Sequence, residues 1–549
     1  MSWRIATWTT SAVAVALLLA TLSGSSVRAQ DGRPSVAACA ALAGAALPVT
    51  TITAADYNDA GRAPGPNASS LPAHCIVRGA IAPRVGIDGR GYETRFELRL
   101  PTEWSGRFFY QGGGGNDGTV APAIGRNTGS FNEPALARGF AVVTTDAGHQ
   151  GAGPEFGLDP VARIEHAHVA HERTATTARA LIERYYGRPI EHSYFVGCSG
   201  GGRQGMMFAQ RYPDIFDGIV ACAPAMSVSS GATIAAAWDS ITFNAIAPPT
   251  ADGGRVLSRA FSSDDLDLVA RGILSTCDAD DGVADGMVQR VESCRFDPAA
   301  LRCPREKDAT CLLSAQVDAL ARAFEGPHDS TGRRLYVGQP WDPGIASPAW
   351  RQWKLGTSET ATPNAINTTL MAGALAYEFF TPPDPAFAFM DFDFDRDPAR
   401  MEAFSREYDT YRDATLAPFR ARGGKLLIFH GTADGIFSAL ESVDYYRRLA
   451  QNNGGLAATQ TWARLFLIPG MNHCAGGPAT DSYDGLAAIV DWVENGVAPD
   501  RVMASALSSN RAFPNRTRPL CPHPAYARYV GEGSIEDAAS FVCAQPPAS

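Results

Sequence analysis

Ser193-Tyr-Phe-Val-Gly-Cys-Ser-Gly-Gly-Gly-Arg203 is a strand-like run that leads into a glycine-rich turn and then into a helical pattern. Gly197, Ser199 and Gly201 match the pattern G-x-S-x-G in this strand–turn–helix setting. Such a turn holds the serine in a strained conformation with its hydroxyl exposed, and the backbone N–H of Gly200 points toward a developing oxyanion. The alternative is a glycine-rich turn with an incidental serine. The context favours a nucleophilic Ser199.

A serine nucleophile needs a general base, and the base needs a carboxylate that orients it. Asp434 follows the strand-like run Lys425–Phe429, and His473 follows the run Leu465–Ile468. Both residues therefore lie on loops at the carboxyl ends of late strands, in the chain order serine, aspartate, histidine that this kind of turn predicts. We expect Ser199, Asp434 and His473 to form a catalytic triad.

A second oxyanion donor is expected on the loop after an early strand. The run Phe108-Phe-Tyr-Gln-Gly-Gly-Gly-Gly115 fits this place, because glycines let backbone N–H groups approach the substrate closely. Gly112 is the predicted donor, with Gly113 as the near alternative. A phosphate-binding loop is the rival interpretation, but the run lacks the Lys-Ser/Thr ending that such a loop needs.

The 549 residues are too many for one minimal domain, and buried runs alternate with helical patterns as in a βαβ sheet. The alternation stops near residue 226 and resumes near residue 413. We therefore expect a signal peptide at 1–29, an α/β catalytic domain formed by 30–226 and 413–549, and an inserted lid domain at 227–412. The expected strands of the catalytic domain are Arg107–Tyr110, Phe140–Thr145, Ser193–Val196, Gly218–Ala223, Lys425–Phe429 and Leu465–Ile468.

The N-terminal segment indicates export. Arg4, the apolar stretch Ser11–Leu22 and Val27-Arg28-Ala29 are typical of a Sec-type signal peptide that is cleaved after Ala29. A membrane anchor is the weaker alternative, because the apolar run is shorter than the roughly 20 residues that span a bilayer. The protein is expected to be secreted or periplasmic. Its net charge of −10 excludes nucleic acid and anionic membrane surfaces as partners.

The cysteines support the same site. An exported chain forms disulfides, and the 11 cysteines leave one unpaired. Local spacing pairs Cys39 with Cys75, Cys277 with Cys294, Cys303 with Cys311, and Cys521 with Cys543. Cys222 lies in a buried run and is the expected free thiol, which leaves Cys198 and Cys474 for each other. Because these two flank Ser199 and His473, a disulfide between them would keep nucleophile and base within reach. The alternative is two buried thiols that never meet.

An acidic loop lies within the expected lid. Cys277-Asp-Ala-Asp-Asp-Gly-Val-Ala-Asp-Gly-Met287 places four carboxylates in eight residues, and such a cluster favours a hard divalent cation. The expected calcium ligands are the side chains of Asp278, Asp281 and Asp285 and the backbone carbonyls of Val283 and Met287. A solvated acidic turn is the alternative. No organic cofactor is expected.

Several of these stretches resemble the tannase and feruloyl esterase family over nearly the whole mature chain. They are the sequences around Ser199, Asp278–Met287 and His473, together with Arg211-Tyr-Pro-Asp. Within the family, the closest resemblance is to the mono(2-hydroxyethyl) terephthalate hydrolase group. The resemblance implies an α/β-hydrolase fold with a large inserted lid, the triad above, the Gly112 and Gly200 oxyanion hole, lid-bound calcium and the five disulfides.

One departure bears on the substrate. The mono(2-hydroxyethyl) terephthalate hydrolase group binds the free carboxylate of its substrate with a lid arginine, whereas this chain has only Lys354 between Arg351 and Arg396. We therefore expect a serine carboxylic ester hydrolase for small aromatic esters of the feruloyl or galloyl type, with Phe437 against the aryl ring. The alternatives are hydrolysis of mono(2-hydroxyethyl) terephthalate, a serine peptidase, and a non-catalytic binding protein on the same fold.

Overall fold

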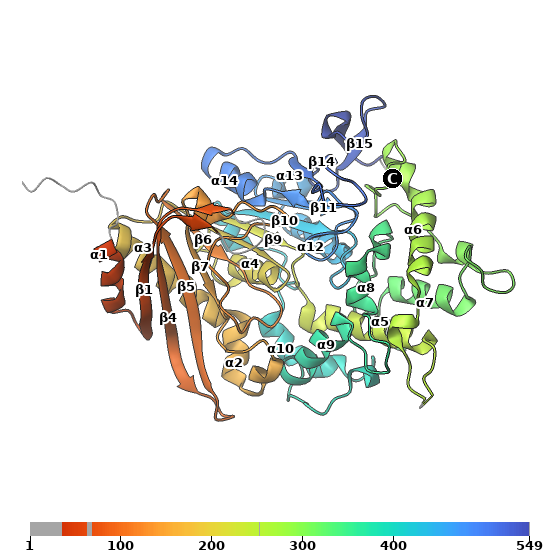
Figure 1. The fold of residues 1–549 in the computed structure, drawn as a ribbon, viewed down its shortest axis with the longest axis horizontal. Coiled ribbons are helices and arrows are strands. Elements are labelled where there is room, and N and C mark those ends of the chain that lie inside the picture. The colour runs from red at the N-terminus through yellow and green to blue at the C-terminus, as the bar shows by residue number, and fades with distance from the viewer. Residues whose placement is uncertain (1–35, 63–68, 252, 548–549) are drawn as a thin grey trace, which may run out of the picture.

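The computed structural model of the chain describes residues 36–62, 69–251 and 253–547 (Figure 1). The predicted signal peptide at 1–29 lies outside these residues. Among the described residues, no helix has the length and apolar character needed to cross a bilayer.

A nine-stranded sheet forms the centre of the molecule. In spatial order its strands are β1 (Thr50–Asn58), β4 (His74–Val85), β5 (Gly91–Pro101), β7 (Ala141–Thr145), β6 (Arg107–Gln111), β8 (His192–Cys198), β9 (Gly218–Cys222), β10 (Lys425–Gly431) and β11 (Ala463–Ile468). From β1 to β7 the strands pair antiparallel, and from β7 to β11 they pair parallel. All six predicted strands are confirmed, and the sheet is that of the predicted α/β-hydrolase fold.

The core lies on both faces of this sheet, because consecutive side chains of a strand point to opposite faces. In β10, Leu426 and Ile428 pack with α3, α4 and α12, whereas Leu427 and Phe429 pack with α14 on the other face. The helices beside the sheet are α1 (Val36–Ala41), α2 (Pro160–Ile164), α3 (Ala170–Tyr186), α4 (Gly200–Arg211), α11 (Ala417–Ala421), α12 (Ala439–Asn452), α13 (Leu456–Thr459) and α14 (Gly485–Asn495).

The chain between β9 and β10 forms a helical layer with no strand of the large sheet in its described residues. Helices α5 to α9 gather on the side of the molecule opposite β1 (Figure 1). The lid boundaries at 227 and 412 stay a prediction. The helices of this layer are α5 (Thr233–Ile246), α6 (Ser263–Cys277), α7 (Ser314–Glu325), α8 (Pro348–Lys354), α9 (Ile366–Gly373) and α10 (Pro398–Tyr408).

Short strands complete the fold and were not predicted from the sequence. They are β2 (Gly61–Arg62) with β3 (Ser70–Leu71), β12 (Ser482–Tyr483) with β13 (Val502–Ser505) and β14 (Thr517–Leu520), and β15 (Tyr526–Tyr529) with β16 (Phe541–Ala544). The antiparallel strands β1, β4 and β5 were also missed. Residues 91–101 alternate charged and apolar side chains rather than forming a continuous buried run, since only part of that strand is covered.

Candidate active site

Ser199 occupies the sharp turn between β8 and α4. Its φ of 63° and ψ of −125° are a conformation that non-glycine residues rarely adopt, at a cost of about 1–3 kcal/mol. The Ser199 N–H donates to the carbonyl oxygen of Cys222 at 3.0 Å, which fixes the turn against β9. A Cβ on Gly197 would lie 2.7 Å from the backbone of Gly201, so the crossing of strand and helix requires glycine there. The predicted strand–turn–helix setting of Ser199 is therefore present.

His473 and Asp434 meet as predicted on the loops after β11 and β10. His473 Nδ1 lies 2.7 Å from Asp434 Oδ2, and Asp434 Oδ1 accepts the backbone N–H groups of Ile436 at 2.8 Å and Phe437 at 3.0 Å. Burial by itself would raise the pKa of Asp434, but His473 and His430 hold that pKa below its ordinary range. The carboxylate is therefore charged, and it accepts the Nδ1–H of His473.

His430 is a second histidine beside this carboxylate. Its Nε2 lies 3.5 Å from Asp434 Oδ2 and 3.1 Å from the Phe437 carbonyl oxygen, and its Nδ1 lies 2.7 Å from Ser442 Oγ. Since both ring nitrogens have partners, His430 supports Asp434 structurally.

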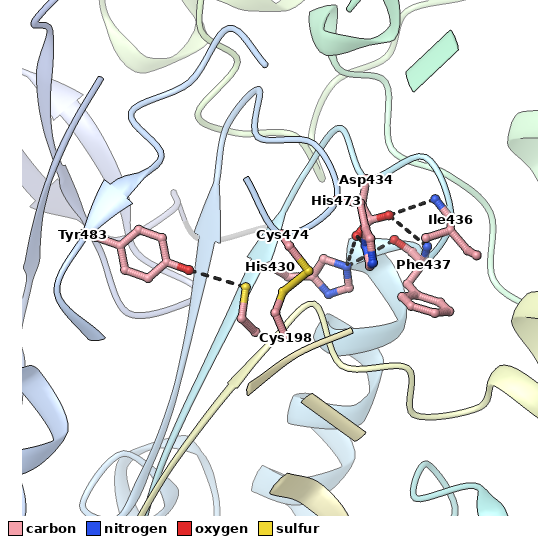
Figure 2. The surroundings of a disulfide bond; sticks show 9 residues. Cys198, His430, Asp434, Ile436, Phe437, His473, Cys474 and Tyr483 are labelled. Atoms are coloured by element: carbon pink, nitrogen blue, oxygen red, sulfur yellow. Dashed lines mark hydrogen bonds and ion pairs between the residues drawn. A yellow bond between two sulfur atoms is a disulfide. The ribbon is translucent and has the colours of Figure 1, made fainter. Parts of the chain in front are cut away.

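A disulfide joins the serine turn to the histidine loop. Cys198 and Cys474 are bonded, with their Cα atoms 5.9 Å apart, and Figure 2 shows the bridge beside His473 and Asp434. Because Ser199 follows Cys198 and His473 precedes Cys474, the bridge limits drift between the two residues.

The other four predicted pairs are also bonded, and Cys222 is the buried free thiol. Burial raises the pKa of Cys222 to about 12, and the Tyr483 hydroxyl lies 3.5 Å from its sulfur. This thiol is therefore protonated at neutral pH and is a packing residue of β9.

The two amides predicted in the glycine run after β6 are both used in hydrogen bonds within the protein. The N–H of Gly112 donates to the Val196 carbonyl oxygen at 2.9 Å, and the N–H of Gly113 donates to Gln204 Oε1 at 3.0 Å. Neither amide is free to bind an oxyanion, which corrects the choice of Gly112. Gly115 lines the same cavity as Ser199 and Gly200, and the amides of Gly115 and Gly200 donate to no acceptor within the described residues.

The cavity at Ser199 is walled by the inserted helical layer. Its lining contains no Lys, Arg, His, Asp or Glu side chain among the described residues. Besides Ser199, Gly115, Asn116 and Gly200, the lining residues are apolar or aromatic: Ala225, Val228, Trp353, Leu370, Met371, Ala374, Phe379, Tyr408, Ile436 and Phe437. The polarity of this lining therefore matches an uncharged group rather than a charged one.

Phe437 and Trp353 connect this cavity to His473. The Phe437 ring lies 5.3 Å from the His473 ring at 70°, which places this predicted substrate contact in the site. The Trp353 ring lies 5.1 Å from the His473 ring at 80°, on the lid side. Sequence reasoning missed Trp353, because no motif or spacing links it to His473.

Lys354 does not reach the cavity. It is buried and forms an ion pair with Asp239, and neither residue lines the space beside Ser199. Lys354, the lysine found in the stretch where the related hydrolases have a lid arginine, therefore pairs with a carboxylate of the helical layer and not with a substrate.

The acidic loop folds back on itself. Asp278 accepts the backbone N–H groups of Asp285, Gly286 and Met287 at distances of 2.9 to 3.2 Å, and Asp285 forms an ion pair with Arg518. Asp281 Oδ2 is buried and has no hydrogen-bond partner among the residues that the structure describes. Within the described residues, no group of three or more His, Cys, Asp or Glu side chains is placed to hold a metal ion.

The chain is similar to known esterases along most of its length. A family model described as tannase and feruloyl esterase matches residues 75–544. A mono(2-hydroxyethyl) terephthalate hydrolase of Piscinibacter sakaiensis is 42% identical over 91% of this chain and 89% of its own, and a probable feruloyl esterase of Arthroderma benhamiae is 30% identical over 82% of each. The crystal structure of feruloyl esterase B from Aspergillus oryzae covers 93% of this chain and 100% of its own, with a TM-score of 0.77 and 27% identity. The chain belongs to the tannase and feruloyl esterase family and is a carboxylic ester hydrolase.

Proposed function

We propose that the chain is an exported serine esterase that cleaves esters of uncharged aromatic acids through an acyl-enzyme. The observation that carries this proposal is the hydrogen bond between His473 Nδ1 and Asp434 Oδ2, on a loop that a disulfide ties to the turn of Ser199. A strained serine turn that a disulfide ties to the loop of an oriented imidazole supports the arrangement that acyl transfer needs.

Each triad member has one role in the proposed reaction. His473 Nε2 takes the Ser199 hydroxyl proton while Oγ attacks the ester carbonyl carbon. The protonated His473 then gives that proton to the leaving alkoxide as the C–O bond breaks. Water enters, loses a proton to His473 and attacks the acyl carbon. The bond from that carbon to Ser199 Oγ then breaks, His473 returns its proton to Oγ, and the acid leaves. Asp434 holds His473 in the required tautomer and stabilises its protonated form.

The oxyanion that forms during both steps needs two donors. Gly200 N–H stands at the N-terminus of α4, where backbone N–H groups have no partner within the helix. Gly115 N–H is the proposed second donor in place of Gly112, since Gly115 lines the cavity of Ser199 and its amide has no acceptor among the described residues.

The uncharged cavity favours a neutral acyl group. A buried carboxylate without a charged partner costs several kcal/mol, and neither Lys354 nor any other cation lines the space beside Ser199 in the described part of the chain. Mono(2-hydroxyethyl) terephthalate, which carries a free carboxylate, is the second candidate substrate, favoured by the relative that is 42% identical.

Matched ester pairs test this proposal. Methyl ferulate, methyl gallate, dimethyl terephthalate and monomethyl terephthalate are assayed side by side with mono(2-hydroxyethyl) terephthalate. We expect kcat/KM for dimethyl terephthalate, corrected for its two ester groups, to exceed kcat/KM for monomethyl terephthalate by at least about tenfold. The reason is that the carboxylate of the monoester finds no cation with which to pair in the cavity. A preference for the charged monoesters would contradict the neutral cavity. Faster cleavage of feruloyl amides than of methyl ferulate would favour the peptidase alternative.

We also propose export. The five disulfides are of the kind that persist in oxidising compartments, which agrees with the predicted cleavage after Ala29.

A structural calcium ion is proposed for the acidic loop. Because the three carboxylates are not grouped around one point in the described residues, Asp278, Asp281 and Asp285 would have to reorient to bind it through their oxygens, together with the carbonyls of Val283 and Met287. The buried, unpartnered Oδ2 of Asp281 supports a missing cation, although Arg518 already neutralises Asp285. The ion would neutralise the loop and take no part in ester cleavage.

Chelation tests the calcium proposal. Without a cation, burial and the neighbouring Asp285 raise the pKa of Asp281 to about 7. The stability that its protonated form supplies is present below about pH 4 and is lost as the pH rises through 7. At pH 8, EDTA should therefore lower the Tm of the wild type by several degrees, and Asp281→Asn in EDTA should unfold above the EDTA-treated wild type. Equal Tm values with and without EDTA would contradict a bound ion.

Loss of the disulfide between Cys198 and Cys474 should lower both the stability and the kcat of the enzyme. It closes a loop of 276 residues, so replacing both cysteines by alanine should destabilise the fold by about 2–5 kcal/mol. The loop of His473 also loses its tie to Ser199, and kcat should fall by about 10- to 100-fold. The matched control replaces Cys303 and Cys311 by alanine. Their disulfide closes a loop of only 8 residues in the inserted helical layer, so this variant should keep the wild-type kcat. An unchanged kcat in the first variant would show that the bridge does not position the base.

A further inference from the structure

A buried histidine–glutamate pair joins the sheet domain to the inserted helical layer. His166 lies in a π-helical turn (Glu165–Val169) before α3, and its Nδ1 lies 2.6 Å from Oε1 of Glu378, 212 residues later. The side chains are 1% and 0% exposed. Both residues lie outside the triad, and no part of the proposed reaction uses them.

The pair stands directly behind one wall of the Ser199 cavity. Glu378 belongs to a second π-helical turn (Ala374–Phe379), and both Ala374 and Phe379 line that cavity. The Phe379 ring lies 5.6 Å from the ring of Tyr408, another lining residue. A shift of Glu378 would therefore move the surface on which an acyl group rests.

Arg203 attaches the same wall to the nucleophile turn. Its backbone N–H donates to the Ser199 carbonyl oxygen at 3.0 Å, and its guanidinium lies 3.8 Å from the centre of the Tyr408 ring. Nη1 donates to the Ala167 carbonyl oxygen at 2.9 Å and to that of Tyr408 at 3.2 Å. The turn of His166 and the wall residue Tyr408 are thus held to one guanidinium that follows Ser199 by one helical turn.

The charge states fit a donor and an acceptor. Burial raises the pKa of Glu378 to about 7, opposed by Arg203, His149 and Arg163, and burial lowers the pKa of His166 to about 3. At pH 8 a neutral His166 therefore donates its Nδ1–H to an ionised Glu378. Glu378 Oε2 has no hydrogen-bond partner in the described part of the chain. Because such a half-satisfied buried carboxylate is a poor source of stability, a positional role explains the pair better.

We propose that His166 and Glu378 are positioning residues that hold the lid wall of the acyl cavity, and so set how tightly an aryl acyl group fits beside Ser199. This inference rests on the proposed esterase function. A small acyl group should contact the wall formed by Phe379 and Tyr408 less than an aryl group does, so the pair should affect aryl esters selectively.

The test compares a large and a small acyl group at pH 8. KM and kcat are measured for methyl ferulate and for 4-nitrophenyl acetate in the wild type, Glu378→Ala and Glu378→Gln. Glu359→Ala is the control, because Glu359 is an exposed lid glutamate in an ion pair with Arg259. We expect Glu378→Ala to raise KM for methyl ferulate about tenfold, the effect of one lost positioning contact, and to leave both constants for the acetate within about twofold. Glu378→Gln keeps an oxygen that accepts the His166 proton and should restore KM.

Equal changes for both esters, or no rescue by Glu378→Gln, would overturn the positioning role. If Glu378→Ala does not fold, the double variant H166F/E378L removes the pair without leaving a buried charge, and it should show the same selective rise in KM. Binding of methyl ferulate to Ser199→Ala, with and without Glu378→Ala, is measured by calorimetry. A wild type that cleaves neither ester would refute the proposed function, whereas the calorimetric comparison would still decide the role of the pair.

Discussion

Replacing Ser199 by alanine should lower kcat for an aryl ester by about a million-fold, to the level that binding and the oxyanion donors alone support. The reason is that the proposed acyl-enzyme forms on Ser199 Oγ, and among the described residues the cavity lining has no other hydroxyl group except that of Tyr408. The measurement is steady-state hydrolysis of methyl ferulate by purified protein. The fold should persist, since alanine keeps the backbone of the turn and all five disulfides.

Replacing Ser199 by glycine separates the backbone strain of the turn from the role of the hydroxyl group. Ser199→Gly should be as inactive as the alanine variant but more stable by about 1 kcal/mol, because glycine adopts a φ of 63° without steric cost. Urea unfolding of the two variants measures the difference. Residual activity above about one thousandth of the wild type in both variants would mean that another group is the nucleophile.

Asp434→Asn should lower kcat by about ten-thousand-fold while leaving the loop in place. The asparagine Oδ1 still accepts the N–H groups of Ile436 and Phe437, so the turn after β10 keeps its shape. At the other oxygen, an NH₂ group would face His473 Nδ1, which forces the wrong tautomer on the ring. The base then presents N–H rather than a lone pair to Ser199.

The pH dependence provides a check on this assignment. Because His473 and His430 hold the pKa of Asp434 below its ordinary range, the wild-type carboxylate is charged from about pH 6 to 8, and the loss in Asp434→Asn should be constant over that range. His430→Gln is the control. It retains a side-chain group for Ser442 and the Phe437 carbonyl and should cost far less than the change at Asp434. If kcat fell equally in Asp434→Asn and His430→Gln, His430 would have a larger role than orienting the turn.

The sequence predicted the parallel half of the sheet, the turn of Ser199 and the pairing of His473 with Asp434 because those features are local. Each of the six predicted strands is a short buried run, and Ser199, Asp434 and His473 each follow such a run directly. The disulfide between Cys198 and Cys474 was predictable for the same reason, since each cysteine is adjacent to a triad residue. Parallel strands then bring these local signals to one edge of the sheet.

Features that depend on orientation could not be read in this way. The glycine run after β6 was recognised, but its amide directions depend on backbone angles that four consecutive glycines leave open, and the choice of Gly112 was wrong. The contact of Trp353 with His473 and the pair of His166 with Glu378 join segments more than a hundred residues apart, without a shared motif. Such contacts arise from packing of the inserted layer on the sheet.

The most direct test of the account is covalent labelling of the active enzyme. A fluorophosphonate reacts with a serine only where a base and an oxyanion hole activate it. Peptide mapping by mass spectrometry should place a single adduct on Ser199, formed in step with the loss of esterase activity and absent from His473→Ala. A stoichiometric adduct on another residue, or full activity in protein that carries the label on Ser199, would contradict the claim that Ser199 is the activated nucleophile.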